Sequence, residues 1–76
     1  MEDKSINLLI LGSSGFIGQN LVEQLSEIDD FNICGVDKRL PEHITPKDFM
    51  IADVSNLKLL KEIVLNFVPN YIINLA

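Results

Sequence analysis

The 76-residue sequence contains one cysteine, no tryptophan and only six basic residues. A single cysteine, Cys34, excludes an intramolecular disulfide and offers no cysteine cluster for zinc. Because it lies in the apolar run FNICGV, we expect a buried structural thiol. The sequence has six basic and 11 acidic residues, which gives a net charge of −5. Phosphate-backbone binding needs clustered lysine and arginine, so we expect no nucleic-acid partner.

Long apolar runs are also missing. No stretch approaches the roughly 18 to 20 apolar residues of a membrane span. The N-terminal sequence MEDKS carries acidic residues where a signal peptide needs basic ones. These absences predict a cytoplasmic protein with no membrane partner. The length suits one small domain or a piece of a larger one.

Short apolar runs alternate instead with amphipathic stretches. Strands are predicted at residues 6–11, 31–36, 49–52 and 71–75. Helices are predicted at 16–28 and 57–68, the second capped by Ser55 or Asn56 and stopped by Pro69. In the first helix the apolar stripe is expected to face the core and the polar residues to face solvent; the stripe is Ile17, Leu21, Val22, Leu25 and Ile28, and the polar set is Gln19, Asn20, Glu23, Gln24 and Glu27.

The element order β-α-β-loop-β-α-β predicts an α/β fold with a parallel sheet and right-handed crossovers. We expect the N-terminal half of a Rossmann-like doubly wound sheet, with strand order 3-2-1-4. Residues 1–76 are therefore predicted to form one fragment of such a fold. The second half of the fold and a substrate domain are predicted to be absent from this chain.

Three glycines follow the first predicted strand in the motif GSSGFIG. Such a turn at the start of a helix binds phosphate, because free backbone N–H groups and a partial positive charge meet there. Gly12 would permit the tight turn, Gly15 would let a pyrophosphate approach, and Gly18 would let the helix pack closely. Further phosphate contacts are expected from the Ser13 and Ser14 hydroxyls and from the N–H groups of Phe16 and Ile17. The alternative is a plain structural turn.

An acidic residue supports the phosphate interpretation. Asp37 stands 19 residues after Gly18, at the end of the second predicted strand. A dinucleotide site has an Asp or Glu about 20 residues on, which accepts the adenosine ribose hydroxyls. That carboxylate would repel the 2′-phosphate of NADP, so NAD is the expected cofactor. Lys38 and Arg39 leave NADP as the alternative, because their positive charges could attract that phosphate.

These residues resemble the N-terminal part of an extended short-chain dehydrogenase/reductase. The segments LLILGSSGFIGQNLVEQL, ICGVDKR, IADVSN and PNYIINLA are similar to the NAD-dependent epimerase/dehydratase branch that acts on nucleotide sugars. The resemblance implies that Asp53 meets the adenine amino group with the Val54 backbone beside it. It also implies that the backbone of Leu75 and Ala76 lines a ribose of the cofactor.

The resemblance also shows what this chain lacks. The family's chemistry uses a Tyr-x-x-x-Lys pair beyond the fourth strand, whereas Tyr71 is followed four residues later by Leu75. We therefore predict no catalytic residue here and take Tyr71 as a packed strand aromatic. His43 has no partner in metal-ligand spacing, so no metal site is predicted.

Two functions remain open at this point. The first is the cofactor-binding segment of a nucleotide-sugar epimerase or dehydratase, inactive by itself. The alternative is a stand-alone nucleotide-binding or self-associating module. A homo-oligomer is expected in either case, because the edge of the fourth strand would be apolar, with Tyr71, Ile72, Ile73 and Leu75.

Overall fold

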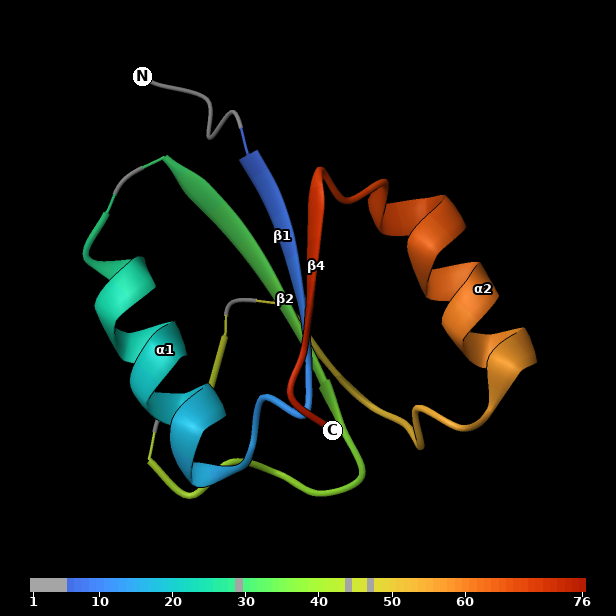
Figure 1. Cartoon of the computed structure of the whole chain (residues 1–76), viewed down its shortest axis with the longest axis horizontal. Helices are drawn as coiled ribbons and strands as arrows, with labels where there is room; N and C mark the ends of the chain where they lie inside the picture. The colour runs from blue at the N-terminus through green and yellow to red at the C-terminus, as the bar shows by residue number, and fades with distance from the viewer. Residues whose placement is uncertain (1–5, 29, 44, 47) are drawn as a thin grey trace.

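A four-stranded parallel sheet stands between two helices in the computed structural model, which describes residues 6–28, 30–43, 45–46 and 48–76. The strands lie in the order β3-β2-β1-β4, and α1 covers one face while α2 covers the other (Figure 1). The predicted α/β class and the order 3-2-1-4 are confirmed. The elements are β1 (Ile6–Leu11), α1 (Phe16–Ser26), β2 (Phe31–Asp37), β3 (Asp48–Ile51), α2 (Leu57–Phe67) and β4 (Tyr71–Asn74).

The core is built around β1, which pairs with both β2 and β4. Successive side chains of a strand point to opposite faces, so Leu8 and Ile10 pack with Val22 of α1. Leu9 and Leu11 pack instead in the second cluster, which contains Ile63 of α2. The prediction that this strand is buried on both faces is confirmed, as is the buried position of Cys34.

The apolar stripe predicted for the first helix is partly wrong. The side chain of Ile17 is 66% exposed, and Ile28 lies beyond the end of α1 and is 46% exposed. The helix instead buries Gly18, Gln19 and Val22. The buried face of α1 is therefore turned toward Gly18, where the helix backbone lies close to the glycine turn. Gln19, predicted to face solvent, is buried.

Near the start of β1, the polar residue Asn7 bonds the strand to the end of α2. Its side-chain amide donates to the carbonyl oxygens of Phe67 at 3.0 Å and Val68 at 3.2 Å, at the end of α2. Val68 has a φ of 52°, in the left-handed region that a β-branched residue adopts at a cost. Asn7 thus satisfies carbonyl groups that the helix cannot satisfy by itself.

Among the described helices, α1 and α2 included, none has the length and apolar character to cross a bilayer.

Candidate functional site

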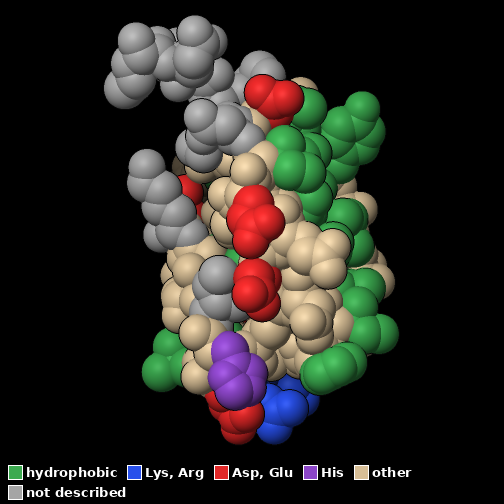
Figure 2. Space-filling view, turned by 90° about the vertical axis from the view of Figure 1, so that its left-hand side faces the viewer, with side chains coloured by type: hydrophobic (Ala, Val, Ile, Leu, Met, Phe, Trp, Pro, Cys, Tyr) green, Lys and Arg blue, Asp and Glu red, His purple; other side chains and the backbone are tan. Residues whose placement is uncertain are grey.

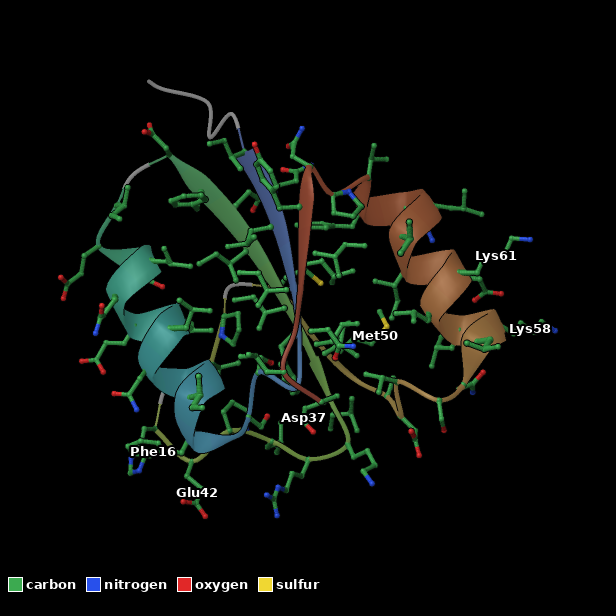
Figure 3. The ribbon with its side chains drawn as sticks, in the orientation of Figure 1. Phe16, Asp37, Glu42, Met50, Lys58 and Lys61 are labelled. Carbon is green, nitrogen blue, oxygen red and sulfur yellow. The ribbon has the colours of Figure 1, made fainter. Side chains whose placement is uncertain are left out.

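The residues predicted to bind a cofactor gather at one end of the sheet. Because parallel strands end on the same side, the segments that follow them meet there. The glycine turn follows β1, Asp37 ends β2, and the Asp53 and Leu75 segments follow β3 and β4. Figure 3 shows Phe16 and Asp37 at this end of the molecule.

The glycine turn has little room for side chains at two of its glycines. Gly12 has a φ of +84°, and a Cβ there would lie 2.9 Å from the backbone N of Ala76 and from the carbonyl carbon of Leu75. A Cβ on Gly18 would lie 2.6 Å from the Gly12 oxygen and 2.7 Å from the Ser13 Cα. These two glycines therefore let the turn pack against the segment after β4 and let α1 pack against the turn.

The N-terminus of α1 is open. Gly15 is its N-cap residue, makes no side-chain capping bond, and is followed by a first turn without acidic residues. A Cβ on Gly15 would meet only the Gly12 oxygen, at 3.7 Å, so the space before the helix is free on that side. By contrast, α2 is capped by Asn56, whose side chain accepts from the Leu59 N–H at 3.2 Å. The first N–H groups of α1 therefore remain available to an anion.

The two serines of the turn are both buried. Ser13 is fully buried, and its hydroxyl has no hydrogen-bond partner among the described residues. A Cβ on Gly35 of β2 would lie 2.5 Å from this hydroxyl oxygen, so Gly35 makes room for it. The Ser14 hydroxyl donates to the Arg39 carbonyl at 2.6 Å. Both side chains are buried, and the Ser14 hydroxyl already has a partner within the chain. The phosphate contacts expected from these hydroxyls remain a prediction.

Asp37 is joined directly to the glycine turn. Its Oδ2 accepts the Ser14 N–H at 2.9 Å, and its Oδ1 accepts the N–H of Lys38 at 2.6 Å. A carboxylate has about four acceptor sites, so both oxygens can accept a further hydroxyl. The half-buried carboxylate thus lies beside the start of α1, while Lys38 is exposed.

The third group of predicted residues follows β3 and β4. The carboxylate of Asp53 accepts the N–H of Ser55 at 2.9 Å and its hydroxyl at 2.8 Å, and these bonds lower the pKa of Asp53. Val54 is half-buried against the α2-side core. Leu75 donates its N–H to the Leu11 carbonyl at 2.8 Å, which fixes the backbone after β4 beside the glycine turn.

Sequence reasoning missed Gln19 and the pocket beside it. A pocket of about 380 Å³ lies between α1 and the loop after β2, lined among others by Gly15, Gln19, Arg39 and His43. Helical periodicity gives no signal for a buried glutamine, because it assigns polar residues to the solvent face.

In the described part of the chain, no group of three His, Cys, Asp or Glu side chains could hold a metal ion.

Comparison with known proteins gives a consistent result. The model of the NAD dependent epimerase/dehydratase family matches residues 8–76. The N-acetyl-alpha-D-glucosaminyl-diphospho-ditrans,octacis-undecaprenol 4-epimerase of Escherichia coli O157:H7 is 38% identical over 61 residues, which cover 80% of this chain and 18% of that protein.

Two solved structures share the fold. The dTDP-glucose 4,6-dehydratase of Bacillus anthracis in complex with NAD is 24% identical, with a TM-score of 0.80 over 95% of this chain and 27% of that one. A short chain dehydrogenase of Leptospira borgpetersenii with bound NAD+ is 32% identical, with a TM-score of 0.77 over 96% of this chain and 32% of that one. The chain spans about a third or less of the length of these relatives.

Proposed function

The chain belongs to the NAD-dependent epimerase/dehydratase family, and from this we propose that it is the dinucleotide-binding segment of a sugar-modifying enzyme. The observation that carries the proposal is the uncapped start of α1, with the Asp37 carboxylate bonded to the turn in front of it. We propose residues 1–76 as the NAD-binding unit. Substrate-binding and catalytic residues would lie elsewhere in a longer protein, since the chain matches only 18% of its epimerase relative.

The proposed roles of the residues follow their positions. The backbone N–H groups of Phe16 and Ile17 would bind the pyrophosphate, which the open side of Gly15 admits. Asp37 would accept the adenosine ribose hydroxyls. Asp53 and Val54 would adjoin the adenine, and the Leu75–Ala76 backbone would line a ribose.

We propose NAD rather than NADP as the cofactor. The Asp37 carboxylate is held beside the turn by the Ser14 N–H, where a 2′-phosphate would meet its negative charge. The two structural relatives described above contain NAD or NAD+, which supports the proposal. When bound, NAD would accept a hydride from a sugar carbon and return it after the intermediate has rearranged.

The proposed substrate is a sugar linked to a diphosphate, as in nucleotide sugars. The epimerase relative is named for a sugar joined through a diphosphate to undecaprenol, which supports this class. The described residues contribute cofactor binding to the reaction. The tyrosine and lysine expected for the chemistry belong to the remainder of such an enzyme.

Calorimetric titration of the chain with NAD, ADP-ribose and NADP tests the proposal. We expect NAD and ADP-ribose to bind and NADP to bind more weakly. Asp37→Asn should reduce the difference between NAD and NADP, because it removes the negative charge that opposes the 2′-phosphate. Asp30→Asn, just before β2 at the opposite end of the sheet, is the matched control and should leave the difference unchanged. Absence of NAD and ADP-ribose binding would overturn the proposal.

The exposed edge of the sheet supports a second candidate, self-association without catalysis. Strand β4 lies at the edge, where Tyr71 is 64% and Ile72 is 51% exposed, so Tyr71 is not the packed aromatic that was predicted. Hydrophobic side chains gather along the right-hand side of Figure 2, the side that Figure 1 shows nearest the viewer. Two β4 strands meeting about a two-fold axis would cover this edge.

Sedimentation velocity over a range of concentrations tests the second candidate. We expect the chain to sediment as a dimer or larger species, and Ile72→Lys to shift it toward the monomer. Lys substitution of Leu65, which is 67% exposed on α2, is the matched control away from β4. A monomer at every concentration would exclude self-association and leave the cofactor proposal unaffected.

A further inference from the structure

Gln19 connects two segments that the proposed cofactor would touch. Its side-chain Nε2 donates to the Ser14 carbonyl at 2.8 Å, inside the glycine turn. Its Oε1 accepts the backbone N–H of His43 at 2.7 Å, in the loop after β2. The residue is only 9% exposed, so water has little access to compete for these bonds. One buried side chain thus joins the glycine turn to the middle of the loop between β2 and β3.

Ser14 holds the near end of the same loop. Its N–H donates to the Asp37 carboxylate at 2.9 Å, and its hydroxyl donates to the Arg39 carbonyl at 2.6 Å. Ser14 and Gln19 therefore fix the stretch from 37 to 43 at three points, and Gln19 also fixes Ser14. We call this set of bonds the Gln19–Ser14 network.

The loop held by this network carries groups with opposite preferences for the cofactor. Asp37 opposes a 2′-phosphate, whereas Arg39 attracts one and is exposed at the rim of the neighbouring pocket. With the Arg39 carbonyl bonded to the Ser14 hydroxyl, the backbone of Arg39 is held away from the position of the Asp37 carboxylate, which the proposed function places beside the ribose. The conformation of the loop therefore favours the carboxylate over the guanidinium.

We propose that Gln19 is a positioning residue that sets the preference for NAD over NADP by holding this loop on the glycine turn. The proposal rests on the proposed function, because it concerns the same cofactor site. Gln19 itself need not touch the cofactor. Its effect passes through the Ser14 carbonyl on one side and the His43 N–H on the other.

Substitution of Gln19 separates this role from a merely structural one. Gln19→Leu keeps an apolar body of similar size and removes both hydrogen bonds. The exposed loop can then move and bond to water, and we expect NAD affinity to fall about tenfold. NADP affinity should fall less, because Ser14, which holds the Arg39 carbonyl, is itself no longer fixed by Gln19, and this gives the Arg39 side chain more freedom to approach the 2′-phosphate. The ratio of the two Kd values should therefore narrow at least about threefold. Gln19→Glu retains the acceptor for His43 and should lie between the wild type and Gln19→Leu.

Gln24→Leu is the matched control, since Gln24 is an exposed glutamine on the same helix. It should leave both affinities unchanged. An equal loss of NAD and NADP binding in Gln19→Leu, or the same narrowing in Gln24→Leu, would overturn the assigned role. The first result would show that Gln19→Leu weakens binding without changing the cofactor preference, and the second that the preference does not depend on the Gln19–Ser14 network.

Hydrogen exchange at the His43 amide tests the network without any ligand. We expect faster exchange in Gln19→Leu, because the acceptor of this N–H is lost, and no change in Gln24→Leu. Unchanged exchange in Gln19→Leu would overturn the network. Absence of NAD binding by the wild type would overturn the proposed function and with it the cofactor preference, while the exchange result would still decide whether Gln19 anchors the loop.

Discussion

The closest approach in the glycine turn allows a quantitative prediction for Gly18→Ala. The added Cβ would lie 2.6 to 2.8 Å from three backbone atoms of Gly12 and Ser13, so α1 and the turn must separate by roughly 0.6 to 0.8 Å to restore ordinary contact at 3.4 Å. Backbone atoms cannot avoid the methyl group by rotating, as a flexible side chain could. Such overpacking costs about 1–3 kcal/mol.

Alanine offsets part of this cost, because it is more favourable than glycine inside a helix by about 1 kcal/mol. The net expectation is a free energy of unfolding lowered by about 0–2 kcal/mol. Urea unfolding followed by circular dichroism measures it. NAD titration of the same sample should show weakened binding, because the retreat of α1 moves its N–H groups away from the turn.

Gly15→Ala is the matched control, from the same motif. A Cβ there meets only the Gly12 oxygen at 3.7 Å, and the φ of −75° suits any residue, so stability should stay within about 1 kcal/mol of the wild type. NAD binding should nevertheless fall, since the methyl group occupies the open approach to α1. If Gly18→Ala were more stable than the wild type, or if Gly15→Ala lost more stability than Gly18→Ala, the reasoning from close approach would be wrong.

Three further predictions concern positions outside the turn. Asn7→Ala should lower the free energy of unfolding by about 1–3 kcal/mol, because two carbonyls at the end of α2 lose their donor. Asn20→Ala, on the exposed side of α1, should lower the free energy of unfolding by less, and equal losses in the two variants would contradict the role of Asn7. Val68→Gly should raise stability by about 0.5–1 kcal/mol in urea unfolding by relieving the left-handed φ of 52°, and a loss of stability would refute the strain. Burial, with a smaller contribution from Asp48, raises the pKa of Cys34 from 9.0 to about 11, so the unfolded thiol ionises first and stability should fall between pH 9 and 11. The wild type should lose about 2–3 kcal/mol of unfolding free energy over this range relative to Cys34→Ala. An identical pH dependence of stability in the wild type and in Cys34→Ala would exclude a raised pKa of Cys34.

The elements of the fold could be predicted because their signals are local. Ile6–Leu11 is a compact apolar run ended by glycine, and the structure places β1 at those residues. The second helix lies between Asn56, whose side chain caps its start, and Pro69, which lacks the backbone N–H that a longer helix would need. The structure places α2 between these two residues. The predicted limits of β2, β3, β4 and α2 differ from the structure by one residue, and α1 ends two residues earlier than predicted. Strand pairing and helix capping, rather than composition, decide these ends.

The interior of the site could not be predicted in the same way. The glycines and Asp37 were found because their spacing reflects a turn and the length of one β-α-β unit. Burial of Ser13, however, depends on the absence of a side chain at Gly35, which is distant in sequence. Burial of Gln19 depends on the path of the loop to His43. These are long-range contacts, and periodicity within one helix or strand carries no information about them.

The contact of Gly12 with the backbone of Leu75 and Ala76 has a consequence for the order of events during protein synthesis. A ribosome delivers the chain from its N-terminus at about 5–20 residues per second, so the glycine turn emerges several seconds before the segment that packs against it. Until then β1 has no neighbour on its β4 side, and its apolar side chains are open to wrong partners. The nascent chain therefore passes through a stage in which β1 is available to a chaperone and the glycine turn still lacks its contact with Leu75 and Ala76.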